Sequence, residues 1–353
     1  MGVSKNNNNY KFKNINWWIN KKSGNIQIHP KIPLDDLYFK SHGSGTIGKT
    51  WKDHHELFFT LVKKYLKGNI CEIGGGQNSI LNKINDFSKI KNFYCFDRNL
   101  KLEKKSKKIK KISKFFDKNY FDNKNFLVDL LIHSHTFEHL YDPNQFLNDV
   151  KSILSKNGKH IFTMPNMKPM IKKGYANAMN FEHPFYYDEK LIDCLLYKNN
   201  FKIIKKIFFK EDHSIMYVTK INNSLSMVNK PKINVYSEYK KNLKLFEQMF
   251  NIWKRDIAKI NKLTKKHKNI FIFGAHIFSQ MMIFNGLNNK NITGILDNDH
   301  QKTHKFLYGT NFKISNPSIL KKFDQPFVVL RAGSYNKEIK KQLFEINKNV
   351  IVV

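Results

Sequence analysis

The chain has 353 residues and a formal net charge of +34, with 41% hydrophobic and 14% aromatic residues. This length and apolar content suffice for two domains with buried cores. No apolar run approaches the ~20 residues that a membrane helix requires, and the first residues, MGVSKNNNNYKFK, lack the apolar core of a signal peptide. Because Cys71, Cys95 and Cys194 lie far apart, the sequence predicts neither a zinc site nor a disulfide framework, and we expect a cytoplasmic protein.

Lysine supplies nearly all of the positive charge, since Arg98, Arg255 and Arg331 are the only arginines. Proteins that bind bases and phosphates depend on the planar arginine fork. The lysines also accompany many Asn, Ile and Phe residues, a mixture that AT-rich codons produce. The composition therefore disfavours a nucleic-acid partner and favours an anionic small substrate, which we expect a lysine-rich cleft between two domains to bind in a monomer or homodimer.

The N-terminal segment, residues 1–50, is polar and irregular over its first 40 residues. It ends in GSGTIGKT (Gly43 to Thr50), which fits the phosphate-loop pattern G-x-x-x-x-G-K-[ST]. Such a loop needs a buried strand before it and a helix after it. WKDHHELFFTLVKKYL predicts the helix, but PLDDLYFKSH is charged on both sides of a short apolar patch and makes a poor central strand. The sequence therefore disfavours a triphosphate site.

Strand and helix patterns alternate from residue 51 to 225. In chain order they predict a helix over 51–66, the strand NICEI, a helix near 78–90, the strand NFYCF, a helix or loop near 100–112, the strand FLVDLLIHS, a helix near 143–155, the strand KHIFTMPN and a hairpin over 201–220. This βαβ alternation predicts an α/β fold with a parallel sheet covered on both faces.

The second part of the chain repeats this alternation on a smaller scale. Residues 231–265 predict a long polar helix, within a linking segment over 226–267. The strands NIFIFG, NITGILDND and PFVVL and a helix near 276–287 then predict a second, smaller Rossmann-like domain over 268–353.

A glycine-rich turn is the strongest sign of a ligand site. The strand NICEI leads into Gly74, Gly75 and Gly76, and the next strand ends in Asp97, 21 residues after Gly76. Glycines in such a turn let the backbone approach a ligand, and the acidic side chain can bind ribose hydroxyls. Dinucleotide and S-adenosylmethionine (SAM) sites share this arrangement, so an NAD(P)- or nucleotide-dependent enzyme is the alternative at this point.

The segment DLLIHSHTFEHLYDPNQFLNDVKSILSKNGKHIFTMPN resembles the class I SAM-dependent methyltransferases. The matching motifs are Glu138-His139-Leu140, Asp142-Pro143, Leu154 with Gly158, and Pro165-Asn166, and the resemblance covers about 66–220. It implies SAM as the cofactor and a site made of Glu72, Gly74, Gly75 and Gly76 on the methionine side, Asp97 at the ribose, Phe116 and Asp117 at the adenine, and Ser134 and His135 at the sulfonium. We expect His139 to pack under the turn.

A narrower resemblance, to sugar C-methyltransferases that act on nucleotide-linked keto-deoxysugars, extends over most of the chain. SHGSGTIGKTWKDHH is similar to a lid segment of that family, which implies that His42, Gly45 and Thr46 lie over the methyl donor. FGAHIFSQ, ILDND and YGTNFKISNPSIL are similar to its C-terminal Rossmann-like domain. The resemblance implies four parts: a segment with a lid (1–50), a SAM-binding domain (51–225), a linking helix (226–267) and a substrate-contact domain (268–353).

The family's active-site run Tyr-His-Glu-His resembles Asn180-Phe181-Glu182-His183, of which only the last two residues are shared. Histidine titrates near neutral pH and a neighbouring carboxylate can orient it, so we expect His183 to be the general base, beside Glu182 and Asn180. His213 is a second candidate.

The resemblance implies methyl transfer to a sugar, on a nucleotide carrier, in surface-polysaccharide or deoxysugar biosynthesis. A site with one base fits transfer to oxygen or nitrogen better than transfer to carbon. The family's four-cysteine zinc module has no counterpart here, and we expect no metal. A nucleic-acid methyltransferase is the alternative, but the Asn/Asp-Pro-Pro-aromatic motif of amino-methylating enzymes is missing.

Overall fold

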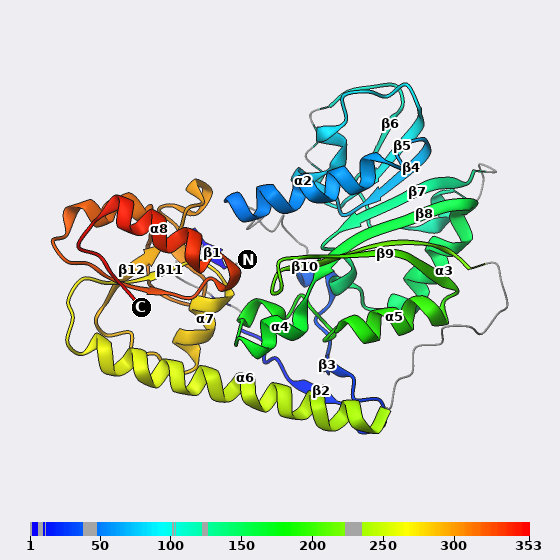
Figure 1. Cartoon of the computed structure of the whole chain (residues 1–353). Coiled ribbons are helices and arrows are strands. Elements are labelled where there is room, and N and C mark those ends of the chain that lie inside the picture. The colour runs from blue at the N-terminus through cyan, green and yellow to red at the C-terminus, as the bar shows by residue number, and fades with distance from the viewer. Residues whose placement is uncertain are drawn as a thin grey trace.

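The computed structural model describes residues 2–5, 10, 12–37, 48–100, 102, 104–121, 126–222 and 235–353. It contains two α/β units side by side, and the long helix α6 (Val235–Thr264) runs along both of them (Figure 1). Within these ranges, no helix is both long and apolar enough to cross a membrane.

The larger unit is built on a seven-stranded sheet with the strand order β6-β5-β4-β7-β8-β10-β9. Its strands are β4 (Gly68–Ile73), β5 (Ile90–Phe96), β6 (Ile109–Ile112), β7 (Val128–Ser134), β8 (Leu154–Pro165), β9 (Phe201–Phe209) and β10 (Ser214–Ile221). The pairs from β6 to β8 are parallel, and β10 pairs antiparallel with β8 and β9, as the predicted sheet and hairpin require. Both faces are buried: on β5, Tyr94 and Phe96 join one core, and Phe93 and Cys95 join the other.

The helices of this unit are α2 (Lys49–Lys63), α3 (Pro143–Ile153), α4 (Met167–Lys172) and α5 (Glu189–Lys198). Local sequence sets where α3 begins. The Asp142 carboxylate accepts a hydrogen bond of 2.9 Å from the backbone N–H of Gln145, and Pro143 occupies the first turn. The predicted helices over 51–66 and 143–155 are confirmed to within a turn.

The predicted helix near 78–90 is wrong, since this stretch holds two short 3₁₀ turns, Gly76–Asn78 and Ile80–Lys83. The Ser79 hydroxyl accepts the backbone N–H of Leu81, and the Glu72 carboxylate accepts that of Ile80. Side chains that bind nearby backbone N–H groups in this way compete with the regular helical pattern.

Residues 100–112, expected to be a helix or loop, contain the edge strand β6. Its inward residues, Ile109 and Ile112, are buried, and the lysines between them are exposed. The high lysine content concealed this strand, because lysine is common on the exposed edges of sheets but weakly favours strand structure.

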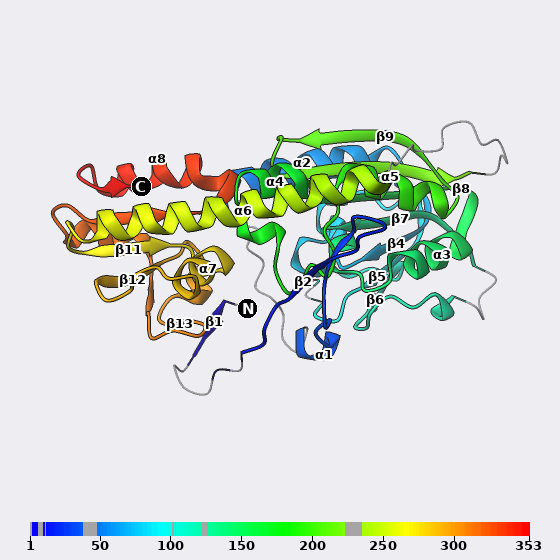
Figure 2. The same ribbon diagram turned by 90° about the horizontal axis from the view of Figure 1, so that it is seen from below.

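The N-terminal segment is less irregular than expected and touches both units (Figure 2). Strand β1 (Val3–Ser4) pairs with β13 (Phe306–Leu307) of the C-terminal unit. The hairpin of β2 (Trp17–Ile19) and β3 (Ile26–Ile28) lies on the larger unit. The described part of PLDDLYFKSH is the short helix α1 (Leu34–Leu37), not a strand.

The C-terminal unit has a parallel five-stranded sheet with the order β14-β12-β11-β15-β16, which confirms the second Rossmann-like domain. Its elements are β11 (Ile270–Phe273), α7 (Ile277–Phe284), β12 (Ile292–Leu296), β14 (Ile314–Ser315), β15 (Phe327–Leu330), α8 (Asn336–Ile346) and β16 (Ile351–Val352).

Helix α6 packs against the cores of both units. Met249, in its first half, packs in the core of the larger unit, and Ile260, near its end, packs in the core of the C-terminal sheet. Between them, the indole N–H of Trp253 donates a hydrogen bond of 2.7 Å to the carbonyl of Gly174.

Candidate active site

A cavity of about 810 Å³ lies between the two units. It opens at the carboxyl ends of β4, β5 and β7 on one side and of β11 and β12 on the other, where parallel sheets bind ligands. The fold brings most of the site residues expected from the sequence to its lining: Glu72, Gly74, Gly75, Gly76, Asp97, Phe116, Ser134, His135, Asn180, Glu182, His183 and His213.

Of the expected residues that the structure describes, Asp117 does not line it. Asp117 is exposed, and its carboxylate accepts a hydrogen bond of 3.0 Å from the backbone N–H of Asn119 at the start of a short 3₁₀ turn. The expected lid residues His42, Gly45 and Thr46 lie outside the described residues.

The glycine turn after β4 requires glycine. Gly74 has a φ of +70°, and a Cβ there would lie 2.5 Å from the Thr136 hydroxyl oxygen. Gly76 has a φ of +48° and faces the carboxylate of Asp97, which accepts a hydrogen bond of 2.6 Å from the backbone N–H of Asn99. Because side chains are strained at positive φ, the turn keeps the backbone bare next to Asp97.

Glu72 is almost fully buried behind this turn. Its carboxylate accepts hydrogen bonds from the Ser79 hydroxyl and, at 2.8 Å, from the backbone N–H of Ile80. Burial raises the pKa of Glu72 to about 7, although both hydrogen bonds act in the opposite direction. Glu72 therefore anchors the segment that follows the glycines.

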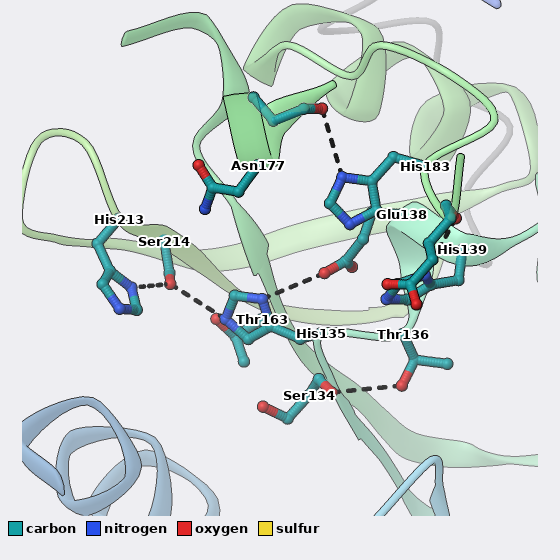
Figure 3. A network of polar contacts seen from close by, with 12 residues as sticks. Ser134, His135, Thr136, Glu138, His139, Thr163, Asn177, His183, His213 and Ser214 are labelled. Atoms are coloured by element: carbon teal, nitrogen blue, oxygen red, sulfur yellow. Dashed lines mark hydrogen bonds and ion pairs between the residues drawn. The ribbon is translucent and has the colours of Figure 1, made fainter. Parts of the chain in front are cut away.

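His135, at the end of β7, connects two parts of the site (Figure 3). Its Nδ1 lies 3.1 Å from a carboxylate oxygen of Glu138, and its Nε2 lies 3.2 Å from the hydroxyl of Ser214. Its φ of +50° is rare for a histidine and turns the chain from the strand toward Glu138. His135 is part of the cavity lining, and its expected position at the sulfonium stays a prediction.

His183 and His139 form a second pair, with ring centroids 5.0 Å apart. Nδ1 of His183 lies 3.3 Å from the Ala178 carbonyl, and Nδ1 of His139 lies 3.1 Å from the Glu182 carbonyl. Because a carbonyl only accepts, each Nδ1 carries a hydrogen. His139, expected to pack under the turn, lines the cavity.

The carboxylate buried beside both rings is that of Glu138, which the sequence marked only as part of the Glu138-His139-Leu140 motif and not as a site residue. Burial, followed by the charge of His139, lowers the pKa of His183 to about 4, while Glu138 and Glu182 act in the opposite direction. Burial alone would raise the pKa of Glu138, but the hydrogen bond from His135 and the three nearby histidines lower it. At neutral pH a neutral imidazole thus faces an ionised carboxylate.

Asn180 is occupied by the turn that carries His183. Its amide oxygen accepts the backbone N–H groups of Glu182 at 2.7 Å and of His183 at 3.2 Å, and its nitrogen donates to the Asn177 carbonyl at 3.1 Å. These contacts account for its place in the run, and a direct catalytic part for Asn180 stays a prediction.

Two groups of side chains in this region have the composition of metal sites. The first is His54, His135 and His213, and the second is Glu138, His139 and His183; in each, the potential ligand atoms lie within 4.8 Å of one another. The sequence did not reveal them, because each group includes residues that are far apart in the chain. In the first group one nitrogen of each histidine already lies within hydrogen-bond distance of a hydroxyl: Nε2 of His54 lies 3.2 Å from that of Thr163, for example.

The C-terminal unit closes the cavity with two side chains that the sequence gave no reason to single out. The Tyr335 hydroxyl lies 3.0 Å from Nε2 of His213. The Glu338 carboxylate accepts the backbone N–H groups of Lys49, at 2.7 Å, and Thr50, at 3.2 Å. In the described part of GSGTIGKT, the helix start that a phosphate loop would offer to phosphate is therefore occupied by a carboxylate.

The expectation of a lysine-rich cleft is wrong. Among the described lining residues the cations are Arg98, Lys114 and Lys302, whereas the carboxylates are Glu72, Asp97, Glu138, Glu182, Asp212, Asp297, Asp299 and Glu338. Lysine favours exposed positions, because its ammonium group is strongly hydrated, so a high lysine content does not predict a basic cavity.

Comparison with known proteins agrees with this geometry. Residues 49–206 match the family model described as a methyltransferase domain, and residues 217–351 match the model of a C-methyltransferase C-terminal domain. No curated protein matches the chain.

Solved structures of methyltransferases resemble about half of the chain. N-methyltransferase NodS from Bradyrhizobium japonicum WM9 is 12% identical over 50% of this chain and 99% of its own, with a TM-score of 0.37. A SAM-dependent methyltransferase from Clostridium acetobutylicum ATCC 824 is 13% identical over 54% of this chain and 97% of its own, with a TM-score of 0.35.

The two family matches cover the two units in turn, and the first contains the glycine turn and Asp97. The cofactor expected from the sequence is therefore confirmed, and the NAD(P)- or nucleotide-dependent alternative is not needed. The protein is a SAM-dependent methyltransferase in which a methyltransferase domain is followed by a C-methyltransferase C-terminal domain.

Proposed function

We propose that this enzyme transfers the methyl group of SAM to a sugar carried by a nucleotide, with His183 as the general base. One observation carries the proposal: a single cavity extends from Asp97 to the Gly274 turn of the C-terminal unit, with His183 in its lining. Its volume of about 810 Å³ leaves room for a second ligand beside the cofactor.

The state of His183 supports its role. SAM carries an activated methyl group on a sulfonium, so the protein has to align the methyl acceptor and remove one proton. Burial keeps His183 neutral at pH 7, and because its Nδ1 lies 3.3 Å from the Ala178 carbonyl, its lone pair is on Nε2. It can therefore take a proton from a substrate placed between the cofactor and the C-terminal unit.

The C-terminal unit supports a nucleotide as the carrier. Its glycine turn, Gly274 with a φ of +106°, its Lys302 and its Asn298 line the cavity. The ammonium of Lys302 lies 3.1 Å from the Asp297 carboxylate and can also be reached by a phosphate entering from the cavity. Arg98 and Lys114 supply positive charge on the other side.

The first test is calorimetric titration of the protein with S-adenosylhomocysteine, ATP-magnesium and NAD in parallel. We expect binding of S-adenosylhomocysteine alone. A panel of nucleotide sugars and the corresponding free sugars, incubated with SAM that carries a ¹³C methyl group, then tests the acceptor. The carbon spectrum of the product distinguishes methyl groups on carbon, oxygen and nitrogen. Transfer to free sugars at equal rate, or to none of the nucleotide sugars, would contradict the proposal.

Replacing His183 tests the base. We expect His183→Ala to lower turnover by about 10²–10⁴-fold, the usual contribution of a general base. Affinity for S-adenosylhomocysteine should stay near that of the unaltered protein, because the expected cofactor residues are elsewhere. His300→Ala, at an exposed histidine outside the cavity lining, is the control. Equal losses of turnover and of cofactor affinity would remove His183 from this role.

A further inference from the structure

Four hydrogen bonds join the C-terminal unit to Glu138. The Tyr335 hydroxyl lies 3.0 Å from Nε2 of His213, and Nδ1 of His213 lies 2.5 Å from the Ser214 hydroxyl. The Ser214 hydroxyl also lies 3.2 Å from Nε2 of His135. Nδ1 of His135 in turn lies 3.1 Å from a carboxylate oxygen of Glu138 (Figure 3). Ser214 is fully buried and Glu138 is 1% exposed, whereas His135 and Tyr335 are partly exposed at the cavity.

In each of the four hydrogen bonds the donor lies on the Tyr335 side and the acceptor lies on the Glu138 side. An ionised Glu138 only accepts, so Nδ1 of His135 carries the hydrogen and its Nε2 accepts from Ser214. The Ser214 oxygen can then accept Nδ1–H of His213, whose Nε2 accepts from Tyr335. One assignment of hydrogens satisfies the whole chain, and each donor in it strengthens the next. The chain therefore stabilises the charged form of Glu138.

The other side of Glu138 is arranged differently. Its second oxygen, Oε2, is buried and has no hydrogen-bond partner among the described residues. Glu138 belongs to the group with His139 and His183, in which one potential ligand atom of each residue lies within 4.8 Å of the others. Nδ1 of His183 lies 3.3 Å from the Ala178 carbonyl, so the neutral imidazole holds its lone pair on Nε2. A buried carboxylate thus lies close to a neutral imidazole that can accept a proton. A buried carboxylate oxygen left without a partner is costly, so this arrangement fits a state in which a proton enters the group.

We propose that Glu138 is a positioning residue for methyl transfer: its carboxylate, held ionised by the chain from Tyr335, stabilises the positively charged His183 that forms when the methyl acceptor loses its proton. This inference rests on the proposed role of His183 as the base. The proton passes from the acceptor to Nε2 of His183 as the acceptor atom bonds to the methyl group and the sulfonium becomes a neutral thioether. The charge on His183 is then balanced by Glu138.

The other titratable groups near His183 do not duplicate this role. His139 lowers the pKa of His183, whereas Glu138 and Glu182 raise it. Around His135 stand His54, His55 and His213, which burial keeps neutral by lowering the pKa of each. Glu138 is the carboxylate that is both buried and connected to the C-terminal unit.

The test needs no acceptor, because it follows the histidine protons themselves. Protein labelled with ¹⁵N in its histidines and saturated with S-adenosylhomocysteine is titrated by NMR from acid to neutral pH, and His183→Gln assigns the signal of His183. Three variants are compared: Glu138→Gln, which keeps the shape and loses the charge, Tyr335→Phe, which removes the first donor of the chain, and Glu345→Gln, an exposed glutamate outside the cavity, as the control.

We expect Glu138→Gln to lower the midpoint of His183 by about one pH unit, since an opposite charge at this distance raises a histidine pKa by that order. Tyr335→Phe should shift the proton of His213 between its two nitrogens and lower the midpoint of His183 less. Glu345→Gln should change nothing. Unchanged cofactor affinity in Glu138→Gln excludes misfolding as the cause.

Two outcomes would overturn the inference. One is a His183 midpoint that is the same in Glu138→Gln, which would leave Glu138 a purely structural role. The other is a divalent metal ion that copurifies one to a chain and is lost in Glu138→Gln, because Glu138, His139 and His183 would then hold a cation. Neither outcome depends on turnover in His183→Ala, so failure of this inference and failure of the proposed base are distinguishable.

Discussion

Asp97 and Asp297 occupy equivalent places in the two units, each at the end of the strand beside a glycine turn. The Asp97 carboxylate accepts a backbone N–H from Asn99 and faces the cavity. The Asp297 carboxylate accepts the backbone N–H of Ala275 at 2.7 Å and the ammonium of Lys302 at 3.1 Å. The same architecture thus offers a ligand-binding carboxylate in one unit and a carboxylate already paired with a lysine in the other.

This difference shows why the fold alone does not reveal a cofactor site. A Rossmann-like strand end supplies a carboxylate near a turn, but the side chain across from it decides whether that carboxylate is available. In the C-terminal unit Lys302 neutralises Asp297, and both side chains are largely buried. The C-terminal unit is therefore free to contact the other ligand of the cavity.

The largest effect should come from replacing Asp97 and Asp297, each in a separate variant. We expect Asp97→Ala to weaken S-adenosylhomocysteine binding about 100-fold, because charged hydrogen bonds to the ribose hydroxyls are each worth about 1.5–3 kcal/mol. We expect Asp297→Ala to leave this affinity unchanged and to lower the free energy of unfolding by about 3 kcal/mol, since it leaves Lys302 without its partner. Calorimetry and denaturant unfolding separate the two, and loss of cofactor affinity in Asp297→Ala would break the comparison.

A pair of glycine variants, one in the turn after β4 and one after helix α7, separates backbone strain from steric contact. Gly74→Ala combines a positive φ with a Cβ 2.5 Å from the Thr136 hydroxyl oxygen, whereas Gly286→Ala, at a φ of +99°, meets nothing within 4 Å. We expect Gly286→Ala to cost about 1 kcal/mol of unfolding free energy from backbone strain alone. Gly74→Ala should cost more and also reduce cofactor affinity. Equal costs would mean that Thr136 moves aside freely.

A further expected effect is a pH dependence of the stability of the larger unit. His133 and His160 lie side by side on β7 and β8, fully buried, with their Nε2 atoms 2.9 Å apart. Burial lowers the pKa of His160 to about 3, and burial and His160 together lower that of His133. Below about pH 6.5 both histidines bind protons in the unfolded chain but not in the folded one. The free energy of unfolding should therefore be constant above about pH 6.5 and fall as the pH drops toward 3.

At pH 5 this loss should be about 2 kcal/mol for His160, at 1.36 kcal/mol for each pH unit below its unfolded pKa. Urea unfolding at pH 7.5 and pH 5 measures it in the unaltered protein. Replacing both histidines with Phe, which fits the aromatic surroundings, should reduce the difference between the two pH values. A difference of the same size in the double variant would assign the effect to the other buried histidines.

Much of the fold was predictable because its signals are local. The alternation of strands and helices, the Asp142-Pro143 start of α3 and the glycine turn before Asp97 each lie within one short stretch. Three errors have physical causes. Side-chain hydrogen bonds replaced the helix near 78–90 by 3₁₀ turns, lysines concealed strand β6, and the excess of lysine lies outside the cavity.

The sequence by itself indicated two Rossmann-like units and the glycine turn beside Asp97, since these depend on periodicity and on local motifs. The resemblance to methyltransferases implied SAM as the cofactor and led to His183 as the expected base. Only the tertiary structure decided which carboxylates are available, because Lys302 covers Asp297 and Tyr335 reaches His213 from another unit. The ionisation of a buried group depends on the side chains that surround it, and these come from distant parts of the chain.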